Sequence, residues 1–323
     1  MNIAEFAHEM NQMGQAKVPF LFVVDFELEK PLLYKLSEVD PGRILFDING
    51  VSNAERRAVI STAMTLEKFP TAREEYERKF EKVFRHLQYG DSFLTNLTTK
   101  TEIKIAKSLE DIFYMCQAKY KILYKDEFLV FSPETFVQLK AGKIYCNPMK
   151  GTIDASIPNA VDTILGDKKE LSEHVTITDL IRNDLSQVAS RVHVARFRYI
   201  DEIKTDSKTL LQISSEIVGQ LEPDYFSQLG DILVKLLPAG SVSGAPKTKT
   251  LAIIKAIEQE KRGYYTGVFG IFDGKNMDSG VMIRYIEKQD EKYFYRSGGG
   301  ITTQSTVAAE YQEAIDKVYV PVN

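Results

Sequence analysis

The sequence has few of the residues that carry metal, redox or disulfide chemistry. Among 323 residues there is no tryptophan, and there are four histidines and two cysteines. Cys116 and Cys146 stand in no metal-type spacing, so we expect no zinc site and a reduced, cytoplasmic chain. The histidines form no H-E-x-x-H pattern and no G-x-S-x-G motif occurs, which argues against zinc hydrolysis and a serine triad.

An excess of charge of one sign and long apolar runs are also missing. The chain has 41 basic and 45 acidic residues, which favours neither nucleic acid nor a membrane surface as principal partner. No apolar run approaches the ~20 residues that span a bilayer, and the first segment lacks the pattern of a signal peptide. The 44% of hydrophobic and 27% of charged residues are typical of a soluble globular protein.

Hydrophobic periodicity predicts an α+β fold without regular βαβ repetition. Apolar runs predict strands at 19–28 and 43–48 within a strand-rich start, and helical spacing predicts a helix with a buried face at 71–90. A hairpin at 134–149 is expected to turn at Ala141-Gly142. No repeat or linker marks a domain boundary. Further helices are expected at 108–120, 168–188, 223–237, 248–259 and from 306, and further strands at 263–274 and 280–288.

Two glycine-rich segments each allow two interpretations. Residues 238–250, "PAGSVSGAPKTKT", lead into a helix and could hold an anion on backbone N–H groups, or could simply be a helix-entry loop. Lysine does not directly follow the second glycine, so this is no Walker A loop. Residues 297–304, "SGGGITTQ", indicate either a close approach to the backbone or a tight turn.

Two pairs of glutamates have the spacing of a shared helical face. Glu170 and Glu173, and likewise Glu310 and Glu313, lie three residues apart on predicted helices. Two such faces across a cleft could bind Mg²⁺, although the pattern alone favours solvated glutamates and a Glu313–Lys317 ion pair.

The sequence pattern also leaves the roles of two further residues open. Arg284 within "GVMIRY" could bind a carboxylate or simply face solvent. Glu134 within "SPETF" could be a plain turn residue.

Lys150 occupies an unusual setting. It follows Asn-Pro-Met and precedes Gly-Thr in "YCNPMKGTI", where turn residues disfavour a helix or a long strand. A surface lysine requires no such surroundings. Composition and spacing therefore indicate an anion-binding α+β enzyme but no particular reaction.

The ordered set of motifs resembles the chorismate-utilising enzymes, a family that includes component I of anthranilate synthase. The matching segments run in family order over roughly residues 85 to 320: "SPETF", "NPMKGT", "SEHVTITDLIRNDL", "PAGSVSGAPKTK", "RGYYTGVFG", "VMIR", "SGGGIT" and "AAEYQEAIDK". The resemblance implies one catalytic domain, with two α/β lobes around a deep cleft. Residues 85–323 would be the chorismate-binding core, and residues 1–84 would be shortened N-terminal strands and a helix of the same domain.

The resemblance also implies the roles of individual residues. In the family, Mg²⁺ is bound by glutamates that match Glu173 and Glu313, with Glu170 and Glu310 nearby, and it bridges to the ring carboxylate of chorismate. The enolpyruvyl carboxylate and the remaining substrate would be held by positions matching Gly151, Ser241, Tyr265, Arg284, Gly298, Gly299, Gly300 and Lys317. Thr152 joins Lys150 and Glu134 in the implied catalytic set.

Lys150 is the residue that selects a reaction within this family. Most relatives carry alanine there, whereas lysine is typical of the members that make 4-amino-4-deoxychorismate. In those members the amine attacks C2 of chorismate while the glutamate matching Glu134 protonates the departing C4 hydroxyl. The lysine must then be neutral and the glutamate protonated, so we expect a lowered pKa for Lys150 and a raised pKa for Glu134.

The function implied is amination of chorismate at C4, on the route to p-aminobenzoate and folate, with ammonia from a glutamine amidotransferase subunit. Leu94 stands where isochorismate and salicylate synthases use a lysine base, which disfavours those activities. Anthranilate synthase component I is the first alternative. An inactive chorismate-binding subunit is the second, because Gln212 and Gln187 depart from the usual family residues. Fewer residues precede the core than in full-length relatives, so no tryptophan feedback site is expected.

Overall fold

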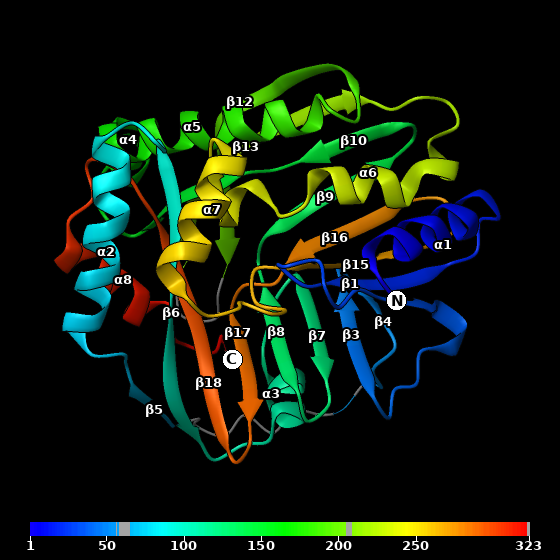
Figure 1. Ribbon diagram of the computed structural model, residues 1–323, viewed down its shortest axis with the longest axis horizontal. Coiled ribbons are helices and arrows are strands. Elements are labelled where there is room, and N and C mark those ends of the chain that lie inside the picture. The colour runs from blue at the N-terminus through cyan, green and yellow to red at the C-terminus, as the bar shows by residue number, and fades with distance from the viewer. Residues whose placement is uncertain (56, 58–64, 205–208, 322–323) are drawn as a thin grey trace.

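Two antiparallel sheets form the framework of the protein (Figure 1). The computed structural model describes residues 1–55, 57, 65–204 and 209–321, apart from the side chains of Thr152, Lys169, Ile203 and Lys204. Within these residues each sheet has nine strands, and helices pack on the outer faces. The α+β class predicted from the sequence is confirmed.

The first sheet has the strand order β11-β13-β10-β9-β16-β15-β1-β2, and β12 pairs with β13. It combines strands from the start, middle and end of the chain, so the N-terminal residues are an integral part of it. Its members are β1 (Phe20–Val24), β2 (Leu32–Lys35), β9 (Thr135–Lys140), β10 (Lys143–Cys146), β11 (Met149–Asp154), β12 (Ser190–Lys204), β13 (Thr209–Gln220), β15 (Val268–Phe272) and β16 (Met277–Val281).

The second sheet has the strand order β14-β6-β18-β17-β8-β7-β3-β4, and β5 pairs with β6. The long strands β6 and β18 pair over most of their length, and they bring the glycine run of β18 alongside β6. The members of this sheet are β3 (Ile44–Ile48), β4 (Val51–Ser52), β5 (Leu66–Phe69), β6 (Leu94–Ile105), β7 (Tyr120–Tyr124), β8 (Phe128–Ser132), β14 (Gly244–Ala245), β17 (Tyr285–Gln289) and β18 (Lys292–Ile301).

The helices cover the outer faces of the sheets (Figure 1). Helix α1 packs on α6, helices α4 and α5 pack on β11 and β13, and α2, α7 and α8 surround β6 and β18. Their bounds are α1 (Ile3–Gln15), α2 (Arg73–Gln88), α3 (Leu109–Met115), α4 (Ala160–Gly166), α5 (Lys168–Leu185), α6 (Leu229–Leu236), α7 (Lys247–Glu258) and α8 (Val307–Asp316), with short 3₁₀ turns η1 (Leu36–Glu38), η2 (Tyr225–Gln228) and η3 (Gly240–Val242). No helix in this described part of the chain is both long and apolar enough to cross a bilayer.

Strand β1 shows how the core joins the two sheets. All five of its residues are buried, because one face packs under the helices and the other faces the second sheet. Phe22 belongs to the core beneath α1 and α6. Leu21 and Val23 belong to the core between the sheets, where they meet residues such as Phe46. Burial on both faces explains why the segment reads as an uninterrupted apolar run.

Several predicted elements are confirmed and others need correction. The hairpin is β9–β10, and both Ala141 and Gly142 at its turn have positive φ. The N-terminal segment was predicted as strands only, but Asn2 caps helix α1 there. The strand predicted at 280–288 is interrupted: β16 ends at Val281 and β17 begins at Tyr285. The break falls at Arg284, whose φ of 53° is incompatible with a continuous strand.

Candidate active site

A cleft with a volume of about 480 Å³ lies where the edges of the two sheets approach each other. Its wall is formed by β11, helices α5 and α8, the β18 glycine run and the loop 240–244. Fourteen of the fifteen predicted site residues line it: Glu134, Lys150, Gly151, Glu170, Glu173, Ser241, Tyr265, Arg284, Gly298, Gly299, Gly300, Glu310, Glu313 and Lys317. The fifteenth, Thr152, pairs with Gln212 through its backbone, and its side chain lies outside the described residues.

Lys150 is placed by a bulge in strand β11. The turn residues of this segment were expected to disfavour a long strand; Met149 and Lys150 pair with β13, and the register shifts between Lys150 and Thr152. Gly151 absorbs the shift with a φ of 73°. The bulge directs the Lys150 amine into the cleft, where Nζ lies 3.1 Å from Oε2 of Glu173. The segment is a short strand with an irregularity.

The charge state of Lys150 differs from the expectation. Burial lowers the pKa of Lys150, but the carboxylates of Glu173, Glu313 and Glu170 outweigh burial, so this pKa is raised above its usual value. The expected lowering is therefore wrong for the protein as described. The ion pair with Glu173 and the neighbouring carboxylates therefore favour the ammonium form of Lys150.

Glu134 lies between β8 and β9, on the same cleft. Its backbone is fixed by a bond from its N–H to Ser132 Oγ (3.1 Å) and by a bond from Val281 N–H to its carbonyl (3.1 Å). The Ser241 hydroxyl donates a short hydrogen bond to its carboxyl oxygen Oε1. Burial raises the pKa of Glu134 in spite of the opposing effects of Ser241, Lys150, Lys317 and Arg284. This is the direction expected for an acid that holds its proton.

A second group of cations stands opposite Lys150. Arg284 lies in the break between β16 and β17, so it faces the cleft rather than solvent. Its buried Nε makes no hydrogen bond among the described residues, which leaves a donor for an anionic ligand. Lys317 donates to the carbonyl of Gly298 (2.9 Å) and pairs with Glu313 (2.6 Å), confirming the predicted ion pair. Tyr265 is 3% exposed, and burial raises its pKa to about 12, so it stays a neutral hydroxyl donor.

The glycine run is part of strand β18 and not a turn. A Cβ on Gly299 would lie 3.4 Å from Glu310 Oε2, 3.6 Å from Lys317 Nζ and 3.7 Å from Glu313 Oε1. A side chain there would therefore fill the space between the charged groups of α8 and the cleft. Of the two interpretations of "SGGGITTQ", the close approach is the correct one.

The four glutamates face the cleft from α5 and α8. Glu173 and Glu310 are 7% and 4% exposed, so a merely solvated face is wrong for them. Oxygen donors of this type suit Mg²⁺, which needs only one or two carboxylates and keeps its other waters. Among the described residues no three acidic, imidazole or thiol groups stand together in a way that could hold a metal ion, and ammonium groups pair with Glu173 and Glu313. The donor chemistry fits magnesium, with Lys150 and Lys317 as its competitors.

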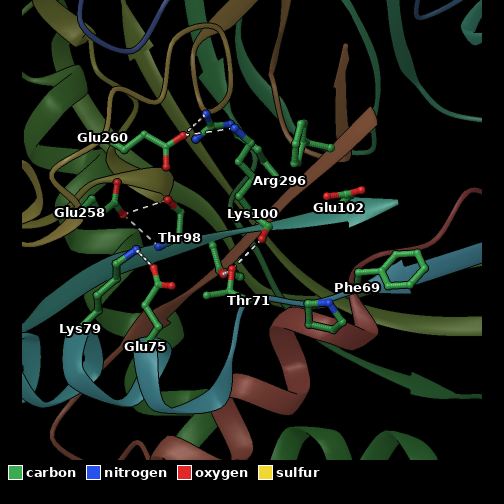
Figure 2. A pocket seen from close by; sticks show the side chains of 13 residues that line it. Phe69, Thr71, Glu75, Lys79, Thr98, Lys100, Glu102, Glu258, Glu260 and Arg296 are labelled. Atoms are coloured by element: carbon green, nitrogen blue, oxygen red, sulfur yellow. Dashed lines mark hydrogen bonds and ion pairs between the residues drawn. The ribbon is translucent and has the colours of Figure 1, made fainter. Parts of the chain in front are cut away.

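Sequence reasoning missed a second, smaller pocket behind the β6–β18 ladder, with a volume of about 290 Å³ (Figure 2). Figure 2 shows its charges pairing with one another: Lys79 with Glu75 (3.0 Å) and Arg296 with Glu260 (2.7 Å). Arg296 also lines the cleft. Nothing in the sequence pattern distinguishes these residues from ordinary surface charges.

Sequence reasoning also missed a buried ion pair beside the cleft. Lys247 Nζ lies 2.6 Å from Asp184 Oδ2, and their side chains are 17% and 10% exposed. Asp184 stands in "RNDL" and Lys247 in "GAPK", so both fall within motifs that the sequence singled out for other reasons. The two residues lie far apart along the chain, so no local sequence pattern predicts that they pair.

Two antiparallel sheets, with a cleft lined by cationic side chains, a glycine run and paired helix glutamates, define the class to which the protein belongs. The chain matches the family model of chorismate binding enzymes over residues 42–323. It belongs to the chorismate binding enzyme family.

Comparison with individual proteins leaves the reaction open. An uncharacterized PabA-like protein of Pasteurella multocida is 48% identical over the full length of both chains. Component 1 of anthranilate synthase from Aquifex aeolicus is 31% identical and component 1 of aminodeoxychorismate synthase from Klebsiella aerogenes 30%, each over 76% of this chain. The chain spans 51% and 57% of those two proteins. The crystal structure of component I of anthranilate synthase from Streptococcus pneumoniae superposes with a TM-score of 0.66 at 27% identity, covering 78% of this chain and 58% of that chain.

Proposed function

We propose that the protein aminates chorismate at C4 to give 4-amino-4-deoxychorismate, as component I of an aminodeoxychorismate synthase. The observation that carries this proposal is the position of Lys150. Its amine lies in the cleft with the half-buried Glu134, and it would stand 3.7 Å from a Cβ on Gly300. The amine is bonded to a carboxylate of the cleft, Glu173, at 3.1 Å.

The chain's own residues support each step of a two-stage displacement. Lys150 Nζ forms a bond to C2, both ring double bonds move by one position, and the C4–O bond breaks as Glu134 gives its proton to the hydroxyl, which leaves as water. Ammonia then forms a bond to C4, both double bonds move back, and the bond between C2 and Lys150 Nζ breaks, which returns the neutral amine. A proton of the new ammonium group goes back to Glu134. Two allylic displacements replace one difficult substitution, which is the advantage of a covalent intermediate. The raised pKa of Glu134 supports its role as the acid.

The same cleft has separate places for the two carboxylates of the substrate. Arg284, Lys317 and the β18 backbone N–H groups provide the cationic side, which we assign to the enolpyruvyl carboxylate. Glu173 and Glu313 would hold Mg²⁺, with Glu170 and Glu310 beside them; the cation would neutralise the ring carboxylate. Because Glu173 pairs with Lys150, release of this carboxylate is also the condition for a neutral Lys150.

The ammonia donor in this proposal is a glutamine amidotransferase subunit. The proposal rests on the reaction, which consumes ammonia, and on the absence of a class I glutaminase nucleophile motif in the sequence. Ammonium salts should replace the partner in the assay.

Anthranilate synthase component I is the competing function. Overall identity does not separate the two, because relatives with either activity are about equally similar. Lys150 separates them, since formation of anthranilate requires no amine at that position. An inactive chorismate-binding subunit is the remaining alternative, and the intact set of acid, nucleophile and glutamates speaks against it.

The test is a product assay on the purified chain with chorismate, Mg²⁺ and ammonium at mildly alkaline pH, with products separated by chromatography. Added aminodeoxychorismate lyase should reveal p-aminobenzoate, and Lys150→Ala should remove it. Anthranilate as the product would reject the proposed reaction. No turnover with ammonium, with or without an added amidotransferase subunit, would favour the inactive subunit.

A further inference from the structure

The acid Glu134 does not hold its position alone. The only described side chain that hydrogen-bonds to its carboxyl group is Ser241, which belongs to the turn η3. Ser241 donates to Oε1, so the dissociable proton of Glu134 is left on Oε2. The hydroxyl of Ser241 therefore decides which carboxyl oxygen can deliver a proton.

The segment 237–246, which we call the Ser241 loop, depends on contacts outside the cleft for its shape. Ser243 Oγ donates to the carbonyl of Ala239 (3.0 Å), and Asn96 N–H donates to the carbonyl of Ser243 (2.9 Å). These bonds fix the second half of the loop against β6. Ser243 also donates to the carbonyl of Gly240 through its Oγ (3.3 Å) and its N–H (3.2 Å), but none of these bonds reaches Ser241.

The first half of the loop rests on the ion pair of Asp184 and Lys247. Lys247, the first residue of α7, donates to the carbonyl of Leu236 at the end of α6 (3.1 Å) and pairs with Asp184 on α5 (2.6 Å). Asp184 Oδ2 would lie only 3.0 Å from a Cβ on Gly240, so the carboxylate is packed directly against the residue that precedes Ser241. The ion pair joins three helices around the start of the loop.

Removing these two charges from water has a free-energy cost, and this cost needs an explanation. Burial raises the pKa of Asp184 against the opposing effect of Lys247, and a buried ion pair contributes little net stability compared with apolar side chains. A cavity of about 20 Å³, lined by both Glu134 and Asp184, separates the pair from the acid. The location of the ion pair is therefore suited to holding the geometry around Glu134.

We propose that Asp184 and Lys247 are positioning residues for the acid: their ion pair holds the Ser241 loop so that Ser241 fixes the carboxyl of Glu134. The role of Glu134 as an acid rests on the proposed function. The ion pair of Asp184 and Lys247, which we call the clamp, is a feature of the fold itself. Neither Asp184 nor Lys247 needs to touch the substrate. The charged groups that face Glu134 are Lys150 from β11, Arg284, and Lys317 at the C-cap of α8, and the variants that remove the ion pair leave these three residues unsubstituted.

Infrared titration of Glu134 tests the clamp without requiring turnover. The carboxylic C=O band of Glu134 is identified by its loss in Glu134→Gln, and its midpoint is followed against pH. Because Ser241 stabilises the carboxylate, Ser241→Ala should move the midpoint up by about one pH unit. Lys247→Met should move it in the same direction, and the double variant should show no further shift, since both changes remove one interaction.

Matched variants separate positioning from general loss of stability. Lys247→Arg keeps the ion pair and should restore the wild-type midpoint. Lys121→Met removes another largely buried lysine, paired with Asp47 at 3.6 Å, and should lower the melting temperature without moving the midpoint. If Lys247→Met does not fold, Asp184→Asn replaces it with the same expected shift.

A midpoint in Lys247→Met or Asp184→Asn that stays at the wild-type value, while Ser241→Ala moves it, would overturn the proposal. Additive shifts in the double variant would do the same. In the product assay, loss of the clamp should lower kcat about ten- to a hundredfold with KM almost unchanged. If the midpoint shifts as expected but no 4-amino-4-deoxychorismate forms, the clamp stands and the proposed function fails.

Discussion

Replacing Lys150 by alanine should tighten the binding of a divalent cation. Lys150 and a metal ion compete for Glu173, because the ammonium group lies 3.1 Å from Oε2 of this carboxylate. Glu173 is 8% exposed at its side chain, so water screens the pair only in part. Removal of the lysine leaves a buried carboxylate without its cation, and a divalent ion is the best available replacement.

The size of the effect follows from this geometry. Two unit charges at this distance interact with about 5 kcal/mol at an effective dielectric constant of 20. Desolvation of both groups cancels much of that value, and about 1–3 kcal/mol remains as the net penalty that a metal ion must overcome. We therefore expect Lys150→Ala to lower the Kd for Mn²⁺ or Mg²⁺ by about five- to a hundredfold.

The measurement is a Mn²⁺ titration followed by electron paramagnetic resonance, with calorimetry for Mg²⁺, on the ligand-free chain. Lys292→Ala is the matched control, because Lys292 pairs with Glu102 at 2.9 Å on the exposed edge of β18 and β6. Its affinity for Mn²⁺ should equal that of the wild type. Unchanged or weaker Mn²⁺ binding by Lys150→Ala would refute competition for Glu173.

Four further outcomes are expected. Glu134→Gln should abolish amination while chorismate binding, measured by calorimetry, persists. Because the pKa of folded Glu134 is raised, its contribution to stability is complete below the unfolded pKa and is lost as pH rises through the folded pKa; chemical denaturation should show a flatter pH profile in Glu134→Gln. Gly299→Ala should raise KM about tenfold, because its methyl group would occupy the space between Glu310, Lys317 and the cleft. Glu258→Gln should destabilise the fold by about 3–5 kcal/mol in urea, since it breaks a buried pair with Arg262 at 2.7 Å.

Local chemistry determined which elements could be predicted from the sequence. The hairpin at Ala141-Gly142 and the helix with Tyr76 and Phe80 on its buried face depend on turn residues and periodicity, which act over a few positions. Helix α1 was missed because its short apolar face was read as part of a strand-rich start, whereas the Asn2–Glu5 capping box is the signal that identifies it. Pairing of β1 with β15 depends on contacts between distant segments, which no local pattern records.

The candidate site likewise has features that sequence motifs predict and features that depend on contacts between distant segments. Resemblance brought the cleft residues together, since each lies in a motif with its own position in the family order. Burial of Glu173 and Glu310 could not be inferred from an i,i+3 pattern, because buried and exposed faces share that spacing. The pKa of Lys150 was predicted in the wrong direction because the chemistry of the reaction was considered without the three carboxylates that surround it.

The pKa values of both central groups of the cleft are raised, which bears on the order of events in the proposed reaction. Burial raises the pKa of Glu134, which favours its protonated form before any ligand arrives. Carboxylates raise the pKa of Lys150, so under the proposed function its amine is inactive as a nucleophile until those carboxylates are engaged elsewhere. If Glu173 binds the metal in the working enzyme, the nucleophile becomes available only in a cleft that already carries the cation. Such an order of events protects the lysine from reacting in a cleft that is not yet complete.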